Sequence, residues 1–198
     1  MSAKFVEYDG KFGQVEANRL TGITFGNIEA QAPAYEACTA TADPIAELEN
    51  GMFLCVVPDD TANGLAGADM GRVAVLPGAA PAEAVPYLVY SEKKIYDERL
   101  GYADFVDRAK DKVDGLLFPK LIGLTPDSCV FTTNTIDEDH HTAAGDVNIV
   151  VGEKLYVGDN GYLSKTAGTN ETFCFVVDKV YTMPDGEVGV KVQCKRFS

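Results

Sequence analysis

Alternation of apolar and polar side chains is clearest between Gly152 and Phe197, and it predicts a β-meander. The last strand has an apolar face and a more polar face, formed by Val188, Val190, Val192 and Cys194 on one side and by Gly189, Lys191, Gln193 and Lys195 on the other. Earlier strands are expected at 154–157, 162–163 and 172–177, with turns at 158–161 and 184–186. The Asn160-Gly161 pair favours a two-residue type I′ hairpin turn, in which both residues need positive φ.

Shorter apolar runs earlier in the chain predict further strands. Two are expected within 34–57, where Asp43-Pro44 breaks the first and residues 45–50 are expected to form a helical turn. The others are expected at 72–76, 87–90 and 121–133. Together with the meander, these runs predict a mainly β protein.

One amphipathic helix is expected near 100–117. Apolar residues recur there at steps of mostly three and four, namely Tyr102, Phe105, Val106, Ala109, Val113 and Leu116. Gly115 and Pro119 are suitable residues to end it. We expect such a helix to cover an open face of a sheet.

The N-terminal residues 1–30 are rich in glycine and have only isolated apolar positions, which predicts an extended arm. The arm could pack on its own body or on a neighbouring subunit. Residues 31–198 are expected to form the β-rich body, with two small β-units at 31–98 and 120–198 joined through the helix.

Charge narrows the choice of partners. The 198 residues contain 30 acidic and 17 basic side chains, which gives a net charge of −13. Such a surface repels phosphate backbones and anionic lipids, so neither nucleic acid nor membrane is an expected partner. It suits docking onto a basic or mixed-charge protein surface. The N-terminus has no apolar segment typical of a signal peptide, and no stretch approaches the ~18 apolar residues of a membrane-spanning helix.

The five cysteines, at 38, 55, 129, 174 and 194, form no C-x-x-C motif. Several lie in apolar strand-like runs, which predicts buried free thiols made in a reducing compartment. A Cys174–Cys194 bridge is the less favoured alternative. The Asn170-Glu171-Thr172 sequon is therefore expected to have no role.

Candidate chemistry is confined to the segment Asp137-Glu138-Asp139-His140-His141, which contains both histidines of the chain. Imidazole and carboxylate groups can bind a transition metal, but adjacent residues rarely chelate one ion. We expect a solvated acidic loop, with a site of His140 and His141 as the metal-binding alternative. No nucleophile motif or phosphate-binding loop is present, so we assign no catalytic, cofactor-binding or metal residue and expect no enzyme.

The meander resembles small β-rich head proteins of tailed bacteriophages, the auxiliary or decoration proteins that bind the outside of a capsid. The resemblance rests on the strand, D-x-G turn and short strand of Lys154–Ser164, on the strand at 173–177, and on Asp185–Val192. The middle segment also resembles phage structural proteins, at residues 96–99, in the expected helix up to Lys112 and at 118–120. This resemblance implies a β-barrel or β-tulip (sandwich) body, often in trimers, with an N-terminal arm.

The first functional hypothesis is therefore a virion structural protein, made in the host cytoplasm, that binds the major capsid protein on the capsid exterior and stabilises or decorates the shell. Homo-oligomers are expected. An intracellular β-rich module that binds a small ligand or glycan is the alternative, although the chain has no tryptophan for sugar stacking. A metal-dependent hydrolase that uses His140 and His141 is the third hypothesis.

Overall fold

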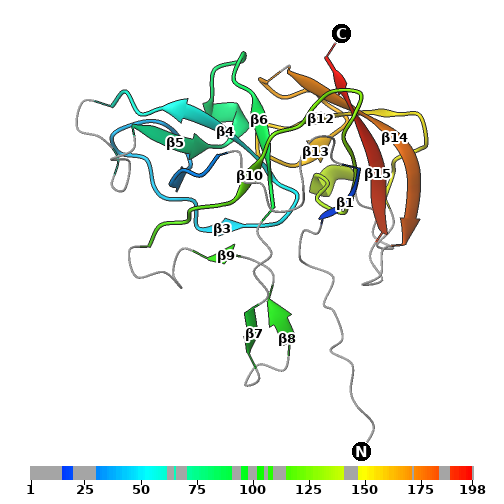
Figure 1. Cartoon of the computed structure of the whole chain (residues 1–198), viewed down its shortest axis with the longest axis horizontal. Helices are drawn as coiled ribbons and strands as arrows, with labels where there is room; N and C mark the ends of the chain where they lie inside the picture. The colour runs from blue at the N-terminus through cyan, green and yellow to red at the C-terminus, as the bar shows by residue number, and fades with distance from the viewer. Residues whose placement is uncertain are drawn as a thin grey trace, which may run out of the picture.

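The computed structural model describes residues 30–61, 65, 71–90, 115–140, 147–170, 172–182 and 188–197, and the backbone of further strands at 15–19, 95–97, 102–104 and 107–108. Strands dominate this part of the chain, which contains two large sheets and two small strand pairs (Figure 1). The prediction of a mainly β protein is confirmed.

The first sheet has six antiparallel strands in the order β1-β11-β15-β14-β12-β13. They are β1 (Val15–Arg19), β11 (Val130–Thr133), β12 (Lys154–Val157), β13 (Leu163–Ser164), β14 (Phe173–Thr182) and β15 (Val188–Arg196). The predicted C-terminal strands are confirmed, but the meander is wrong, because β14 pairs with β12 and leaves β13 at the edge of the sheet. Val190, Val192 and Cys194 of β15 are buried on one face, as the alternation predicts. The predicted turn at 184–186 lies outside the described residues.

This sheet is curled like half a barrel, and the chain beyond β11 bridges its open side (Figure 1). Ile136 pairs in parallel with Leu163 of β13. The Leu163 N–H donates to the Thr135 carbonyl at 3.2 Å, and the Asp137 N–H donates to the Leu163 carbonyl at 2.9 Å. The segment that continues β11 is thus fixed beside β13, the strand at the opposite edge.

The second sheet has five strands in the order β10-β6-β4-β5-β2, and its only parallel pair is β2 with β5. They are β2 (Ala34–Tyr35), β4 (Phe53–Pro58), β5 (Arg72–Val75), β6 (Pro86–Val89) and β10 (Leu121–Ile122), with a short 3₁₀ turn, η1 (Pro77–Ala79), after β5. The strands expected at 52–57, 72–76 and 87–90 are confirmed. The strand expected from 34 ends at Tyr35, and the one expected at 121–133 is split into β10 and β11.

The predicted helix at 100–117 is wrong. Its segment contains β8 (Tyr102–Asp104), which pairs with β7 (Ile95–Asp97), and β9 (Asp107–Arg108), which pairs with β3 (Glu47–Leu48). The aromatic and β-branched residues that suggested an apolar helix face have a stronger preference for strands than for helices. The helical turn expected at 45–50 is also wrong, because this segment contains β3, which pairs with β9.

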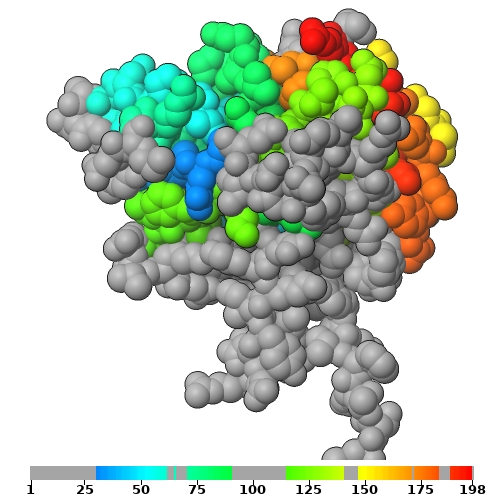
Figure 2. All heavy atoms as spheres, in the orientation of Figure 1, coloured from blue at the N-terminus to red at the C-terminus, as the bar shows by residue number. Residues whose placement is uncertain are grey.

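The two sheets share a core of aromatic rings. Phe53 of β4 lies with its ring centroid 5.4 Å from that of Phe175 in β14 and 6.4 Å from that of Phe131 in β11. All three side chains are fully buried. In the space-filling view, the cyan-to-green and orange-to-red parts of the chain form adjoining surfaces of one body (Figure 2). The division of 31–198 into units at 31–98 and 120–198 stays a prediction.

The hairpin turn between β12 and β13 has a different geometry from the predicted one. The Gly161 N–H donates to the Gly158 carbonyl at 2.9 Å, and the Gly158 N–H donates to the Tyr162 carbonyl at 2.8 Å. Gly161 has φ of +84°, and Asp127 is the only non-glycine residue with positive φ in the described ranges. The hairpin is confirmed, but the type I′ turn is wrong, because positive φ falls on Gly161 and not on Asn160. This is the pattern of a three-residue loop that ends in glycine.

Of the predicted arm at 1–30, the structure describes the backbone of β1 and residue Ala30. β1 pairs with β11 of the same chain, with Val15 opposite Thr133. The rest of the arm, and the question of whether it reaches a neighbouring subunit, lie outside the described residues.

Candidate functional site

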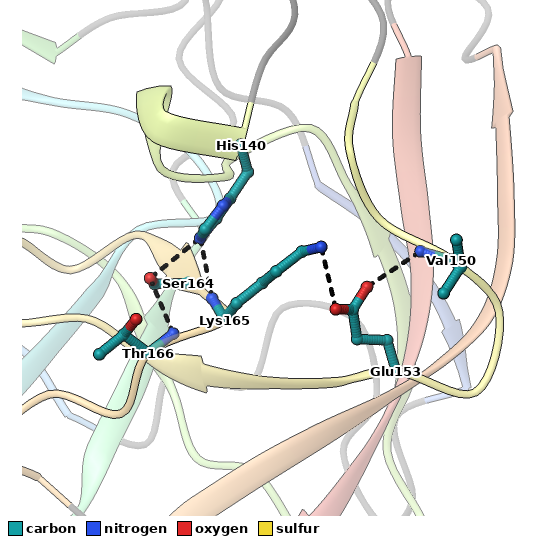
Figure 3. A network of polar contacts seen from close by, with 6 residues as sticks. All are labelled: His140, Val150, Glu153, Ser164, Lys165 and Thr166. Atoms are coloured by element: carbon teal, nitrogen blue, oxygen red, sulfur yellow. Dashed lines mark hydrogen bonds and ion pairs between the residues drawn. The ribbon is translucent and has the colours of Figure 1, made fainter.

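A network of polar contacts joins three segments on one side of the curled sheet (Figure 3). The segments are the short 3₁₀ turn η3 (Glu138–His140), the chain at and after β13, and the turn at 150–153 before β12. η3 reaches β13 because Ile136, which lies just before it, is buried and paired with Leu163. The Asp137 carbonyl accepts the His140 N–H at 2.9 Å, and its side chain accepts the Asp139 N–H at 3.2 Å.

The His140 ring is the centre of this network. Its Nε2 accepts the backbone N–H of Lys165 at 2.9 Å and lies 3.1 Å from the Ser164 hydroxyl oxygen. That hydroxyl oxygen also accepts the Thr166 N–H at 3.2 Å. A ring nitrogen that accepts an N–H has no proton of its own, so the contacts define the neutral ring with its proton on Nδ1.

The Ser164–His140 contact brings together a hydroxyl and an imidazole, which in a hydrolase form a nucleophile and its general base. In that chemistry Nε2 must be available to take the serine proton. Here the same nitrogen already accepts the Lys165 N–H, and Ser164 is only 9% exposed. The geometry therefore favours a structural clasp between η3 and β13.

Glu153 extends the network from Lys165 to the preceding turn. One carboxylate oxygen lies 2.9 Å from the Lys165 ammonium, and the other accepts the Val150 N–H at 3.0 Å. The hydrogen bond from Lys165, and then that from Val150, hold the pKa of Glu153 below its usual value. The carboxylate stays ionised at neutral pH and fixes both ends of the turn at 150–153.

This turn carries the two most exposed large apolar side chains in the described part of the chain. Val150 and Val151 are each 64% exposed. The turn is well defined, because the Glu153 N–H donates to the Val150 carbonyl at 3.1 Å and Gly152 supplies φ of +86°. The Gly152 N–H also donates to the Val177 carbonyl in β14 at 2.7 Å. We call residues 150–153 the valine turn.

The metal hypothesis gains no support from the described residues. Within these ranges, no group of three or more histidine, cysteine, aspartate or glutamate side chains lies in an arrangement that could hold a metal ion. The Asp137 carboxylate accepts an Asn160 side-chain N–H at 3.0 Å, and His140 Nε2 is engaged as described above. His141 lies outside the described residues, so a site that uses both histidines stays a hypothesis.

A tyrosine links the hairpin after β12 to the loop between β3 and β4. The Tyr162 hydroxyl lies 3.5 Å from a carboxylate oxygen of Glu49. Burial of the ring, followed by the negative charge of Glu49, raises the pKa of Tyr162 to about 12. Tyr162 therefore stays neutral through the physiological range.

All five cysteines are free, as predicted, and those at 55, 129, 174 and 194 are buried. Burial raises the pKa of Cys55 and of Cys194 to about 12, which keeps both as unreactive thiols. Burial also raises the pKa of Cys38, which is partly exposed.

The sequon asparagine is an internal anchor. Asn170 is 1% exposed, and its side-chain N–H donates to the Ala84 carbonyl. Its side-chain oxygen accepts the Thr172 N–H at 3.1 Å, and the Thr172 hydroxyl donates to the same Ala84 carbonyl at 3.2 Å. A glycan cannot be attached to Asn170 without breaking these contacts.

Sequence reasoning identified His140 but missed its partners Ser164, Lys165 and Glu153. One local signal was available, since Gly152, which directly precedes Glu153, is a residue type that favours a turn. Comparison with protein-family models, curated proteins and solved structures finds no match. None of the helices that the structure describes is long and apolar enough to cross a membrane.

Proposed function

We propose that this chain is a virion structural protein that binds the major capsid protein on the outside of a phage head and stabilises or decorates the shell. The resemblance of residues 154–192 to head auxiliary proteins supports this proposal, and so does the β-rich body. In this proposal the body is a barrel or tulip-like unit that forms homo-oligomers, trimers among them, and the protein has no enzymatic role.

The observation that carries the proposal is the valine turn. Exposed apolar groups that are held rigidly lose little conformational entropy on binding, so they suit an interface. Val150 and Val151 meet this condition, because Glu153 and Gly152 fix the backbone that carries them. We therefore assign the valine turn as the contact with the capsid protein.

Charge supports a protein partner over nucleic acid. A net charge of −13 favours association with a basic or mixed-charge surface and mainly accelerates the encounter of the two proteins. The exposed charges near the turn include both signs, at Lys154 and Asp178. We expect the apolar contact to provide affinity and the overall charge to influence the rate of binding and its salt dependence.

Sedimentation with capsids tests the proposal. Expanded capsids that lack this chain are mixed with the purified full-length protein, and the pelleted fraction is measured. We expect saturable binding, and at least a tenfold weaker affinity for the double variant Val150→Ser, Val151→Ser, because two apolar side chains are removed from the proposed interface.

Val85→Ser is the matched control, because Val85 is also exposed, at 45%, but lies outside the network. It should bind like the parent chain. Absence of any binding by the parent chain contradicts the proposed function. Binding that the double variant retains in full contradicts only the assignment of the valine turn.

A further inference from the structure

We propose that His140 is an acid-sensitive latch, which holds the chain after β13 in place while its ring is neutral and releases it when Nε2 takes up a proton. The latch is a property of the fold, so it does not depend on the proposed capsid function. It rests on the contacts of one ring nitrogen with Ser164 and Lys165.

The chemistry of Nε2 makes the contact sensitive to acid. A neutral ring offers one lone pair at this nitrogen, and the Lys165 N–H is directed at it from 2.9 Å. When a solvent proton adds to Nε2, that nitrogen becomes a donor and faces another donor. The Lys165 N–H then has no acceptor there, whereas the Ser164 hydroxyl can turn and accept the new N–H from 3.1 Å. Protonation therefore breaks the bond from Lys165 and makes His140 the donor in the contact with Ser164.

The release extends to the valine turn through two further contacts. The side chain of Lys165 bonds to one oxygen of Glu153, whose other oxygen accepts the Val150 N–H. Movement of the Lys165 backbone carries its ammonium group away from Glu153. Glu153 then holds the Val150 N–H less firmly, and the turn becomes more mobile.

The charged groups around the ring come from both sides of the contact. η3 and the residue before it contribute the carboxylates of Asp137, Glu138 and Asp139, and the facing segments contribute the ammonium of Lys165 and the carboxylate of Glu153. The pKa of Glu153 is held below its usual value, so this carboxylate remains charged while histidine titrates. Protonation at Nε2 therefore changes the hydrogen-bonding role of the imidazole while Glu153 remains an acceptor.

Amide hydrogen exchange on the ¹⁵N-labelled full chain tests the latch. Protection factors of the Lys165 and Val150 amides, corrected for the intrinsic effect of pH, are measured between about pH 7.5 and pH 5, together with the NMR titration of the His140 ring. We expect Lys165 protection to fall about tenfold as the ring is protonated, which corresponds to the loss of one hydrogen bond. The protection of the Val150 amide should fall with it. The protection of the Cys194 amide, which is bonded to the Cys129 carbonyl at 2.9 Å, should not change.

Two glutamine variants make the test specific. His140→Gln places a carbonyl oxygen near the position of Nε2, so it keeps an acceptor but cannot be protonated, and its Lys165 protection should stay high down to about pH 5. His141→Gln should behave like the parent chain. Lys165 protection that does not change as His140 titrates overturns the proposal, and so does an unchanged pH response in a folded His140→Gln variant.

Discussion

The backbone N–H of Phe53 in β4 donates a hydrogen bond of 2.8 Å to the carbonyl of Gly161 in the turn between β12 and β13. This bond joins the five-stranded sheet to the hairpin of the six-stranded sheet. A second bond lies nearby, from the Thr135 hydroxyl to the Asn50 carbonyl at 2.7 Å. The start of β4 is thus fixed to the curled sheet by its backbone and by the aromatic ring of Phe53.

Replacing Gly161 with alanine should destabilise this junction strongly. A Cβ atom at Gly161 would lie 2.7 Å from the Phe53 carbonyl oxygen, and φ is +84°. We expect the free energy of unfolding to fall by about 3 kcal/mol, from the backbone penalty together with the steric conflict. Urea unfolding measures the change.

Gly71→Ala separates the two effects. Gly71 also has positive φ, at +69°, but a Cβ atom there would meet nothing within 4 Å. The free energy of unfolding of Gly71→Ala should therefore fall by only about 1 kcal/mol. Equal losses in the two variants would show that the contact with Phe53 contributes nothing to stability.

Phe53→Ala should remove the aromatic group that β4 contributes to the shared core. We expect a loss of about 3–5 kcal/mol, because the side chain is fully buried and its removal leaves a cavity. A double-mutant cycle with Phe175→Ala should give a coupling of about 0.5–1.5 kcal/mol, as expected for rings 5.4 Å apart. Denaturant unfolding of the single and double variants measures both quantities.

Phe118→Ala is the control for this core prediction. The Phe118 ring is 42% exposed, so its removal should lower the free energy of unfolding by much less than Phe53→Ala does. A similar loss at both positions would exclude the shared core as a main source of stability.

Alkaline pH should weaken the fold in part through Tyr162. The pKa of this tyrosine is raised to about 12 in the folded chain, against 10.0 for the ordinary side chain. The contribution of Tyr162 to the free energy of unfolding is complete below pH 10. It is lost as the pH rises towards 12, because this tyrosine ionises first in the unfolded chain. Urea unfolding measures the free energy of unfolding at about pH 8.5 and pH 11. Its fall between these two pH values should be about 1 kcal/mol smaller in Tyr162→Phe than in the parent chain, after allowance for the partly exposed ring.

Ultraviolet absorbance gives an independent measure of this ionisation. The difference between the parent chain and Tyr162→Phe isolates one tyrosine, which should ionise near pH 12 in the folded protein. A difference signal that titrates near pH 10 would contradict the burial and charge effects assigned to Tyr162.

Alkylation should distinguish the five thiols. At about pH 8, iodoacetamide should label the partly exposed Cys38 first, and Cys55 and Cys194 at least about 100-fold more slowly, because both are buried with a pKa of about 12. Mass spectrometry of peptides locates the label, and unfolding in urea should make all five positions react. Early labelling of Cys55 or Cys194 in the folded chain would refute the prediction.

Local patterns were sufficient to predict the strands with strong signals. Phe53–Pro58 is a continuous apolar run, and Val188–Arg196 alternates at every position, so each strand is evident from its own residues. The segment around Tyr102 misled the same reasoning, since apolar residues three and four apart also occur in short strands. Its pairing partners, β7 and β3, are not evident from spacing.

The candidate site could be predicted only in part, for a related reason. His140 stood out as one of two histidines, but its acceptor contact is with a backbone N–H that lies 25 residues away. Neither Ser164 nor Lys165 forms a motif with it. The contact exists because Ile136 pairs with Leu163, and that pairing depends on how the whole sheet curls.

The return of the chain from β11 to β13 has a consequence for synthesis on the ribosome. Residues 53, 84 and 136 find their partners only at 161, 170 and 163, so these three residues lack their partners until the C-terminal strands have emerged. Folding should therefore be completed after translation rather than in step with it. Expression clones that stop before Asn170 should yield aggregated chains, whereas the full chain needs its last third to close the body.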